Sequence, residues 1–253
     1  MPEISVLTAL FNPNLQYLQD SYGDLQGQTA DWEWIIQWDG PATCDLPEEI
    51  AGDPRVHIHE GDRQWGIAIT RNRALMRASA EILYVHDYDD RIMPGTLSAI
   101  VEVLLDRPDL VYTCGHWDDL VQDEDGAWRV VEFPDHGIGP GLLEPGWKPQ
   151  RRSESGRAIA PPPSSYGLRR VYVDAYGGWG ALSSGEDNHL ISALRSQHPG
   201  WYLPGTLGLY RKHSRSMTAN ASEAELYEQH TSFVERRIKA LETISGLADK
   251  TRS

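Results

Sequence analysis

Three aspartates follow directly on an apolar run in EILYVHDYDD, residues 81–90. Asp87 and Asp89 are two positions apart, so at a strand end their side chains point to the same side. Paired carboxylates suit a hard cation such as Mg²⁺ or Mn²⁺, which prefers oxygen ligands and often keeps substrate phosphate oxygens in its shell. The run can also be an acidic turn, in which Asp90 caps the helix that Pro94 begins. Taken alone, the motif favours the turn.

Two further polar residues have both a chemical and a structural interpretation. Asp39, in IIQWDGP, can accept the N–H groups of a nucleobase, or it can begin a turn with Gly40. Arg71, in ITRNRAL, can contact a phosphate or a base carbonyl, or it can lie on a solvated helix face with Arg73 and Arg77. For each residue alone, the structural interpretation is favoured.

The second half of the chain adds three candidates. Glu186 and Asp187 open a predicted helix in GEDNHL, where acidic residues are favourable and where a carboxylate can also act as a general base toward a hydroxyl. Trp179, in YGGWG, can offer an apolar face to a sugar ring, or it can pack beside a glycine C-cap. His213, in YRKHSR, can bind a metal, and the two basic residues before it can contact phosphate. A lone histidine is more often structural.

Strands and helices alternate over residues 1–115. Apolar, β-branched runs predict strands at 4–10, 32–38, 55–60, 81–87 and 110–115. Apolar residues at helical spacing predict helices at 15–25, 66–80 and 94–108. Alternation of this kind predicts an α/β fold with a mostly parallel sheet and helices on both faces. Ligands of such sheets bind beyond the C-terminal ends of the strands, where we expect Asn12, Asp39 and Asp87.

The alternation stops after residue 115. The segment 117–134 predicts a hairpin, and the Pro- and Gly-rich segment 134–163 predicts a long loop, which is usually mobile or functional. Further elements are expected as helices near 165–176 and 187–197, a short strand at 206–213 and a C-terminal helix at 222–245. We expect a single domain overall, with one half at 1–115 and the other at 116–253.

Composition excludes several function classes. The chain has 253 residues and a net charge of −14, whereas a protein that grips a nucleic-acid backbone needs a basic face. A nucleic-acid polymer is therefore disfavoured as a partner, and a small phosphorylated ligand is not. No apolar run approaches the about 20 residues of a membrane span, and MPEISVLTALF lacks a basic segment before its apolar stretch. We therefore expect a cytoplasmic protein with Cys44 and Cys114 reduced.

The order of these motifs resembles the family 2 glycosyltransferases, nucleotide-sugar enzymes of the Rossmann-like GT-A fold. Their Tyr-Asn-like strand end, Asp-Asp-Gly-Ser-like turn and Ala-Arg-Asn helix core correspond to LTALFN, WDGP and ITRNRAL. Their Asp-x-Asp motif with a Pro-led helix corresponds to VHDYDDRIMPGTL. YGGWGALSSGEDNHL and YRKHSRS correspond to the later elements of the family. The resemblance covers roughly 1–115 and 164–218, and the sequence departs from it at Leu10, Trp38, Pro41 and His86.

The resemblance implies a role for each matching residue. It implies a nucleotide-sugar site formed by Ala9, Leu10, Phe11, Asp39, Arg71, Asp87 and Trp179. It implies a site for a divalent cation, Mn²⁺ or Mg²⁺, formed by Asp89, Asp87 and His213. The general base would be Asp187, with Glu186 beside it.

The resemblance also implies an inverting mechanism. A carboxylate would deprotonate an acceptor hydroxyl that attacks the anomeric carbon in line, while the metal stabilises the leaving nucleoside diphosphate. A UDP-sugar is the favoured donor, and 134–163 is a candidate acceptor-site or lid segment. The acceptor and the oligomeric state, a homo-oligomer included, stay open.

Two other functions compete with sugar transfer. One is a nucleotidyltransferase of similar sheet topology, although FNPNLQ lacks the Gly-rich, basic loop that this class normally carries after its first strand. The other is a nucleotide-sugar- or carbohydrate-binding protein without turnover. The presence of both Asp89 and Asp187 argues against a binding protein without turnover.

Overall fold

The first half of the chain forms a parallel sheet, as the alternation predicts. The structure is a computed structural model that describes residues 1–134, 136–148, 160–182, 185–213 and 232–244. Four parallel strands lie side by side in the order β3 (Val56–His59), β2 (Trp32–Trp38), β1 (Ile4–Leu10) and β4 (Ile82–Val85). The mixed α/β architecture with a central sheet is thereby confirmed.

Helices cover both faces of this sheet, which explains the continuous apolar strands. All residues of β2 are buried, and strands covered on both faces are near-continuous hydrophobic runs. One apolar core lies under α1 (Leu15–Gln26) and α4 (Thr96–Asp106). The other lies under α3 (Ile67–Leu75), α5 (Arg170–Ala175) and α6 (Glu186–Gln197). A short helix, α2 (Glu48–Ala51), precedes β3.

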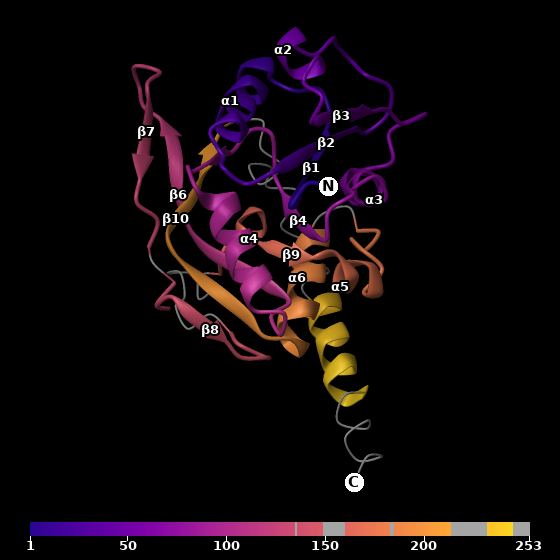
Figure 1. Cartoon of the computed structure of the whole chain (residues 1–253), viewed down its shortest axis with the longest axis vertical. Helices are drawn as coiled ribbons and strands as arrows, with labels where there is room; N and C mark the ends of the chain where they lie inside the picture. The colour runs from indigo at the N-terminus through magenta and orange to yellow at the C-terminus, as the bar shows by residue number, and fades with distance from the viewer. Residues whose placement is uncertain (135, 149–159, 183–184, 214–231, 245–253) are drawn as a thin grey trace.

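The part of the chain after β4, mostly its second half, widens the sheet (Figure 1). β9 (Gly167–Arg169) runs antiparallel between β4 and β6 (Tyr112–Gln122), and β6 pairs in parallel with β10 (Gly200–Lys212). Three shorter strands pair at the margins: β5 (Arg91–Ile92) and β8 (Gly141–Leu143) with β10, and β7 (Trp128–Val131) with β6. The β6–β7 pair confirms the hairpin predicted over 117–134.

Several elements of this half differ from the sequence prediction. The helix expected at 165–176 is a 3₁₀ turn, η1 (Pro163–Ser165), followed by β9 and only then by α5. The loop expected at 134–163 contains β8 within its described residues, and β10 begins at Gly200 rather than near 206. The short strands carry too few residues to show a period. Where their residues are buried, neighbouring elements bury them: Leu143 is 2% exposed, whereas Leu142 beside it is 46% exposed.

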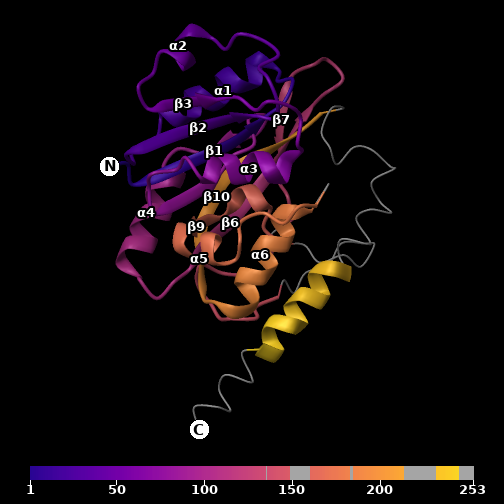
Figure 2. The same ribbon diagram turned by 90° about the vertical axis from the view of Figure 1, so that its right-hand side faces the viewer.

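The predicted C-terminal helix is described over residues 232–244 and lies beside α6 (Figure 2). Arg237 Nη1 is 2.7 Å from His189 Nδ1 on α6, and the rings of Phe233 and His189 stack with centroids 5.2 Å apart. None of the helices among the described residues combines the length and the apolarity needed to cross a bilayer.

Gly167 is the residue that lets β9 fit between its neighbours. A Cβ at this position would overlap Ile100 Cγ2 on α4 and would lie 2.7 Å from Thr113 Oγ1 on β6. We expect Gly167→Ala to lower the free energy of unfolding by about 1–3 kcal/mol, because overpacking a close contact forces its neighbours apart. Urea denaturation monitored by circular dichroism measures this change.

Gly23→Ala is the matched control. Gly23 lies inside α1, and a Cβ there meets no atom within 4 Å. We expect this substitution to raise the free energy of unfolding by about 0.5–1 kcal/mol, since alanine is the better helix residue. Equal effects of the two substitutions would contradict the packing argument.

Candidate active site

Arg71 brings together residues from three distant parts of the sequence. Its side chain, on α3, is only 2% exposed. Nη2 lies 2.7 Å from Asp87 Oδ1, just after β4. Nη1 donates to Glu186 Oε1 and lies 3.8 Å from Asp187 Oδ2, both at the start of α6. Three carboxylates predicted from the sequence thus converge on the guanidinium of a fourth predicted residue, Arg71.

Burial and mutual repulsion raise the pKa values of the two α6 carboxylates beside Arg71. Burial raises the pKa of Glu186 to about 7, against the opposing charge of Arg71 and with a further rise from Asp187. Burial likewise raises the pKa of Asp187, again opposed by Arg71. Burial disfavours the charged form of Arg71, but Asp87 and the two α6 carboxylates together raise its pKa above the ordinary value. A carboxyl group that titrates near neutrality is suited to proton transfer.

Asp39 fixes the N-terminus of the helix that carries Arg71. One carboxylate oxygen, Oδ1, accepts the backbone N–H groups of Trp65 at 2.7 Å and Gly66 at 3.0 Å, and the hydroxyl of Thr70 at 2.9 Å. Gly66 has a φ of 89°, a conformation that favours glycine. The end of β2 is thereby joined to α3. This cap is neither of the two roles that the sequence suggested, and base pairing by Asp39 stays a prediction.

Asp89 and His213 form a second polar pair at the same edge of the sheet. Asp89 Oδ2 lies 2.7 Å from His213 Nε2, although 124 positions separate the residues. Burial and the negative charge of Asp87 raise the pKa of Asp89, with His213 opposing. A positive charge beside this carboxylate is therefore favourable.

These residues fit a cation whose shell is completed by phosphate. Among the described residues, no group of three or more His, Cys, Asp or Glu side chains stands ready to hold a metal ion. Asp87, predicted as a ligand, already pairs through Oδ1 with Arg71. Asp89 and His213 supply one carboxylate and one imidazole. Cations such as Mg²⁺ are commonly bound by one or two carboxylates together with substrate phosphates.

Comparison with known proteins decides the family. The sequence profile described as glycosyl transferase family 2 matches residues 5–175, more than half of the chain. The chain belongs to glycosyl transferase family 2. Its sequence is 29% identical over 110 residues to "Putative teichuronic acid biosynthesis glycosyltransferase TuaG" of Bacillus subtilis (strain 168). This alignment covers 42% of the chain and 43% of that relative, so the chain spans less than half of the relative's length.

Solved structures agree on the fold. The chain resembles S. aureus TarS 1-349 with a TM-score of 0.64 at 15% identity, over 94% of this chain and 65% of that one. The same fragment in complex with UDP-GlcNAc gives a TM-score of 0.66 at 16% identity, over 94% and 66%. These similarities show that the chain has a mixed α/β sheet like that of TarS.

Other residues expected in the nucleotide-sugar site of a family 2 enzyme lie in different surroundings. The side chain of Leu10 is fully buried in the core, and that of Trp179 is 2% exposed. Trp179 is held through its backbone, which exchanges hydrogen bonds of 2.8 and 2.9 Å with the side chain of Asn72. Phe11 is 51% exposed beyond β1, and Ala9 is half-buried. Phe11 is the member of this set best placed to contact a ligand.

His86 is a core residue. Its side chain is fully buried, and its ring stacks on that of Tyr84 with centroids 6.3 Å apart. Burial lowers the pKa of His86 to about 4, so the ring is neutral near pH 7. A neutral imidazole thus occupies the apolar position that the family pattern has before its Asp-x-Asp motif.

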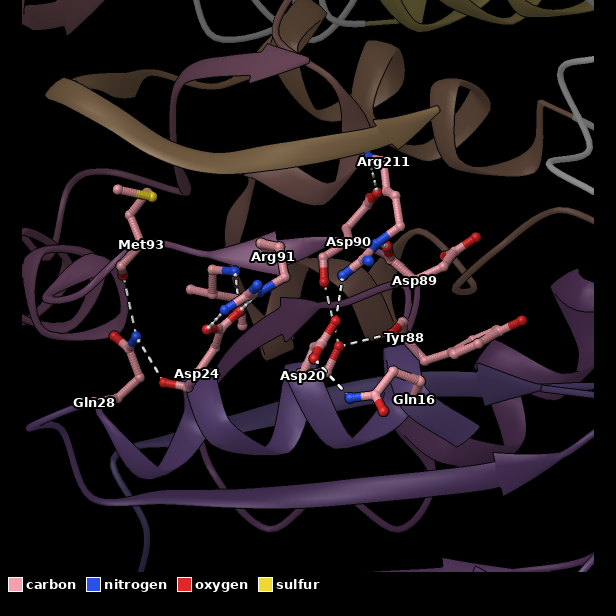
Figure 3. A network of polar contacts seen from close by, with 12 residues as sticks. Gln16, Asp20, Asp24, Gln28, Tyr88, Asp89, Asp90, Arg91, Met93 and Arg211 are labelled. Carbon is pink, nitrogen blue, oxygen red and sulfur yellow. Dashed lines mark hydrogen bonds and ion pairs between the residues drawn. The ribbon is translucent and has the colours of Figure 1, made fainter. Parts of the chain in front are cut away.

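Asp90 and Arg211 form a buried network that the sequence did not reveal (Figure 3). Asp90 Oδ1 accepts the backbone N–H of Arg211 at 3.0 Å, and the Arg211 side chain is 2% exposed. The sequence suggested that Asp90 caps the helix after Pro94, but the residue before α4 is Gly95, which has no side-chain cap. The helix-cap prediction for Asp90 is therefore wrong, because the carboxylate is used by β10 instead.

Arg71→Ala tests the dependence of the site on its central cation. The substitution leaves three carboxylates near one another without their counter-charge. We expect the free energy of unfolding at pH 8 to fall by about 3–5 kcal/mol, the usual cost of breaking a buried ion pair. Arg73→Ala is the control on the same helix, because the Arg73 side chain is 31% exposed and pairs at 3.5 Å with Asp62, which is 71% exposed, so its loss should cost about 1 kcal/mol or less. Similar losses in the two variants would contradict the central role of Arg71.

Glu186 makes stability depend on pH. Its pKa is about 7 in the folded chain against an ordinary value of 4.5, so the folded state holds this proton over a pH range in which the unfolded state has lost it. The free energy of unfolding should therefore fall as pH rises from about 4.5 to 7, by at most about 3 kcal/mol from this group.

Glu186→Gln should make that fall shallower, and Glu102→Gln, at an exposed position on α4, should leave it unchanged. Urea denaturation at several pH values measures both slopes. An unchanged slope in Glu186→Gln would show that this carboxyl titrates as an ordinary glutamate.

Proposed function

We propose that the chain transfers a sugar from a nucleoside-diphosphate sugar to a hydroxyl acceptor, with inversion at the anomeric carbon and with a divalent cation. The observation that carries this proposal is the junction at Asp87 and Asp89. Asp87 contacts Arg71 and through it the α6 carboxylates, while Asp89, two residues on, contacts His213. Groups suited to a diphosphate and groups suited to a hydroxyl proton therefore lie on either side of one short segment.

The proposed general base is Asp187 rather than Glu186. The Glu186 side chain is 4% exposed and bonded to Arg71, whereas that of Asp187 is 22% exposed and 3.8 Å from the same guanidinium. A base must reach the proton that it removes, so the more accessible carboxylate is the better candidate. Glu186 would keep Arg71 in place. Direct attack by the deprotonated acceptor, opposite the leaving diphosphate, gives inversion.

Asp89 and His213 would hold a Mn²⁺ or Mg²⁺, whose chemistry is to neutralise charge on the departing diphosphate. A UDP-sugar is the proposed donor, supported by the similarity to a TarS structure in complex with UDP-GlcNAc. Residues 1–115 would form the donor half and 116–253 the acceptor half. Membership of the family favours sugar transfer over nucleotidyl transfer and over binding without turnover.

Donor binding tests the proposal. We expect at least one UDP-, GDP- or TDP-sugar to raise the melting temperature of the wild type in the presence of Mn²⁺ and not in its absence. Asp89→Ala should abolish this stabilisation, because it removes the carboxylate from the cation site. Asp106→Asn, at an exposed position at the end of α4, is the control and should bind as the wild type does.

Turnover separates the base from the donor site. Asp187→Asn should keep the Mn²⁺-dependent stabilisation and should lose about 10²–10⁴-fold in the release of nucleoside diphosphate, the usual contribution of a general base. If none of the nucleotide sugars stabilises the wild type with Mn²⁺ present, the proposed function is wrong.

A further inference from the structure

Arg211 links the end of β10 to two other segments near the proposed cation site (Figure 3). Its Nε donates to the backbone carbonyl of Asp89 at 2.7 Å, and its Nη2 lies 2.8 Å from Asp20 Oδ2 on α1. The side chain is 2% exposed, so these contacts are made away from solvent. Arginine suits such a position because its planar guanidinium presents several donors in a fixed geometry.

Two aromatic rings hold the same guanidinium. The Arg211 Cζ atom lies 4.1 Å from the ring centroid of Tyr17 on α1 and 4.9 Å from that of Trp128 on β7. Cation–π contacts are strongest where the cation is removed from water. The Tyr17 ring also lies 5.6 Å from the ring of His213. Arg211 is therefore fixed by α1, by the β6–β7 hairpin and by the turn that carries Asp89.

The backbone of β10 is fixed at the same residue. Asp90, which is 1% exposed, accepts the Arg211 N–H at 3.0 Å, and Arg211 is in register with Leu120 on β6. β10 ends at Lys212, and His213 follows it directly. Fixing Arg211 thus also restricts the position of His213, whose Nε2 lies 2.7 Å from Asp89 Oδ2.

We propose that Arg211 is a positioning residue that holds His213 against Asp89, so that the cation and diphosphate site is assembled jointly by β10 and the Asp87–Asp90 turn. This role rests on the proposed function. It differs from the phosphate contact suggested by the basic YRKHSR sequence, because a guanidinium that is 2% exposed and engaged with Asp20 and the Asp89 carbonyl is not free to meet a ligand.

The proposal predicts a loss of cation affinity without removal of any cation ligand. Groups that orient a metal's ligands typically change metal affinity by 10–100-fold when mutated. We therefore expect Arg211→Ala to weaken Mn²⁺ binding in the presence of UDP by about 10–100-fold. Arg211→Lys keeps the charge but not the forked donor geometry, and it should give an intermediate loss.

Electron paramagnetic resonance of Mn²⁺ on the full chain measures this affinity in the presence of UDP. The control is Arg129→Ala, because Arg129 lies on β7 beside Trp128 but is 70% exposed and pairs with Asp123. It should bind Mn²⁺ as the wild type does. Electron spin echo modulation from an imidazole nitrogen should be present in the wild type, absent in His213→Ala and reduced in Arg211→Ala. A substitution that only lowers stability would not remove this nitrogen signal from the folded fraction.

The outcomes separate this role from the proposed function. A wild type that binds no Mn²⁺ with UDP and is not stabilised by any of the nucleotide sugars with Mn²⁺ contradicts the proposed function, and this role with it. Suppose that the wild type binds Mn²⁺ and UDP and that Asp89→Ala does not bind Mn²⁺. If Arg211→Ala then keeps the full Mn²⁺ affinity and the nitrogen signal, only the role of Arg211 is overturned. Should Arg211→Ala fail to fold, Asp20→Asn removes one partner of the guanidinium and decides the question. A several-fold loss of Mn²⁺ affinity in that variant supports the role, and an unchanged affinity overturns it.

Discussion

The structure depends on one buried guanidinium, that of Arg71, which pairs with several carboxylates. A buried charge is tolerated only where partners compensate it, and Arg71 finds its partners at the end of β4 and the start of α6. Burial raises the pKa of both Glu186 and Asp187, and the charge of Arg71 opposes that rise. Asp39 extends the dependence by fixing the loop that begins α3. The positions of β2, α3, β4 and α6 at this edge of the sheet therefore follow from one set of charge contacts.

A second constraint is that α6 and β10, late in the chain, both lie at the edge of the sheet where β4 ends. α6 brings Glu186 and Asp187 to Arg71, and β10 brings His213 to Asp89. Both elements come from the second half of the chain, and both reach the segment that follows β4. The antiparallel β9 makes this possible, because it joins the parallel strands of the first half to β6 and β10. The segment after β4 is thus where the two halves of the chain meet.

The sequence predicted most of the first half and less of the second. Before residue 115, most strands are continuous apolar runs and the helices are long enough to show a period, so their positions could be predicted, β5 excepted. β5, β8 and β9 contain two or three residues each, too few to show a pattern in the sequence. The same limit applies to roles. Asp87 and Arg71 could be selected by residue type, but the cap made by Asp39 and the contact of Asp90 with Arg211 depend on residues 26 to 121 positions away.

Charge connects the geometry to the proposed chemistry. The chain carries a net charge of −14, and the segment after β4 adds three aspartates close to two further carboxylates on α6. Arg71 is already engaged by three of these acids and Arg211 by Asp20, so neither offers its charge to an incoming diphosphate. On the proposed function, the donor would bring negative charge to a site that is already acidic. A divalent cation between Asp89 and the diphosphate would offset part of this negative charge, so on the proposed function metal dependence would follow from the electrostatics of the site.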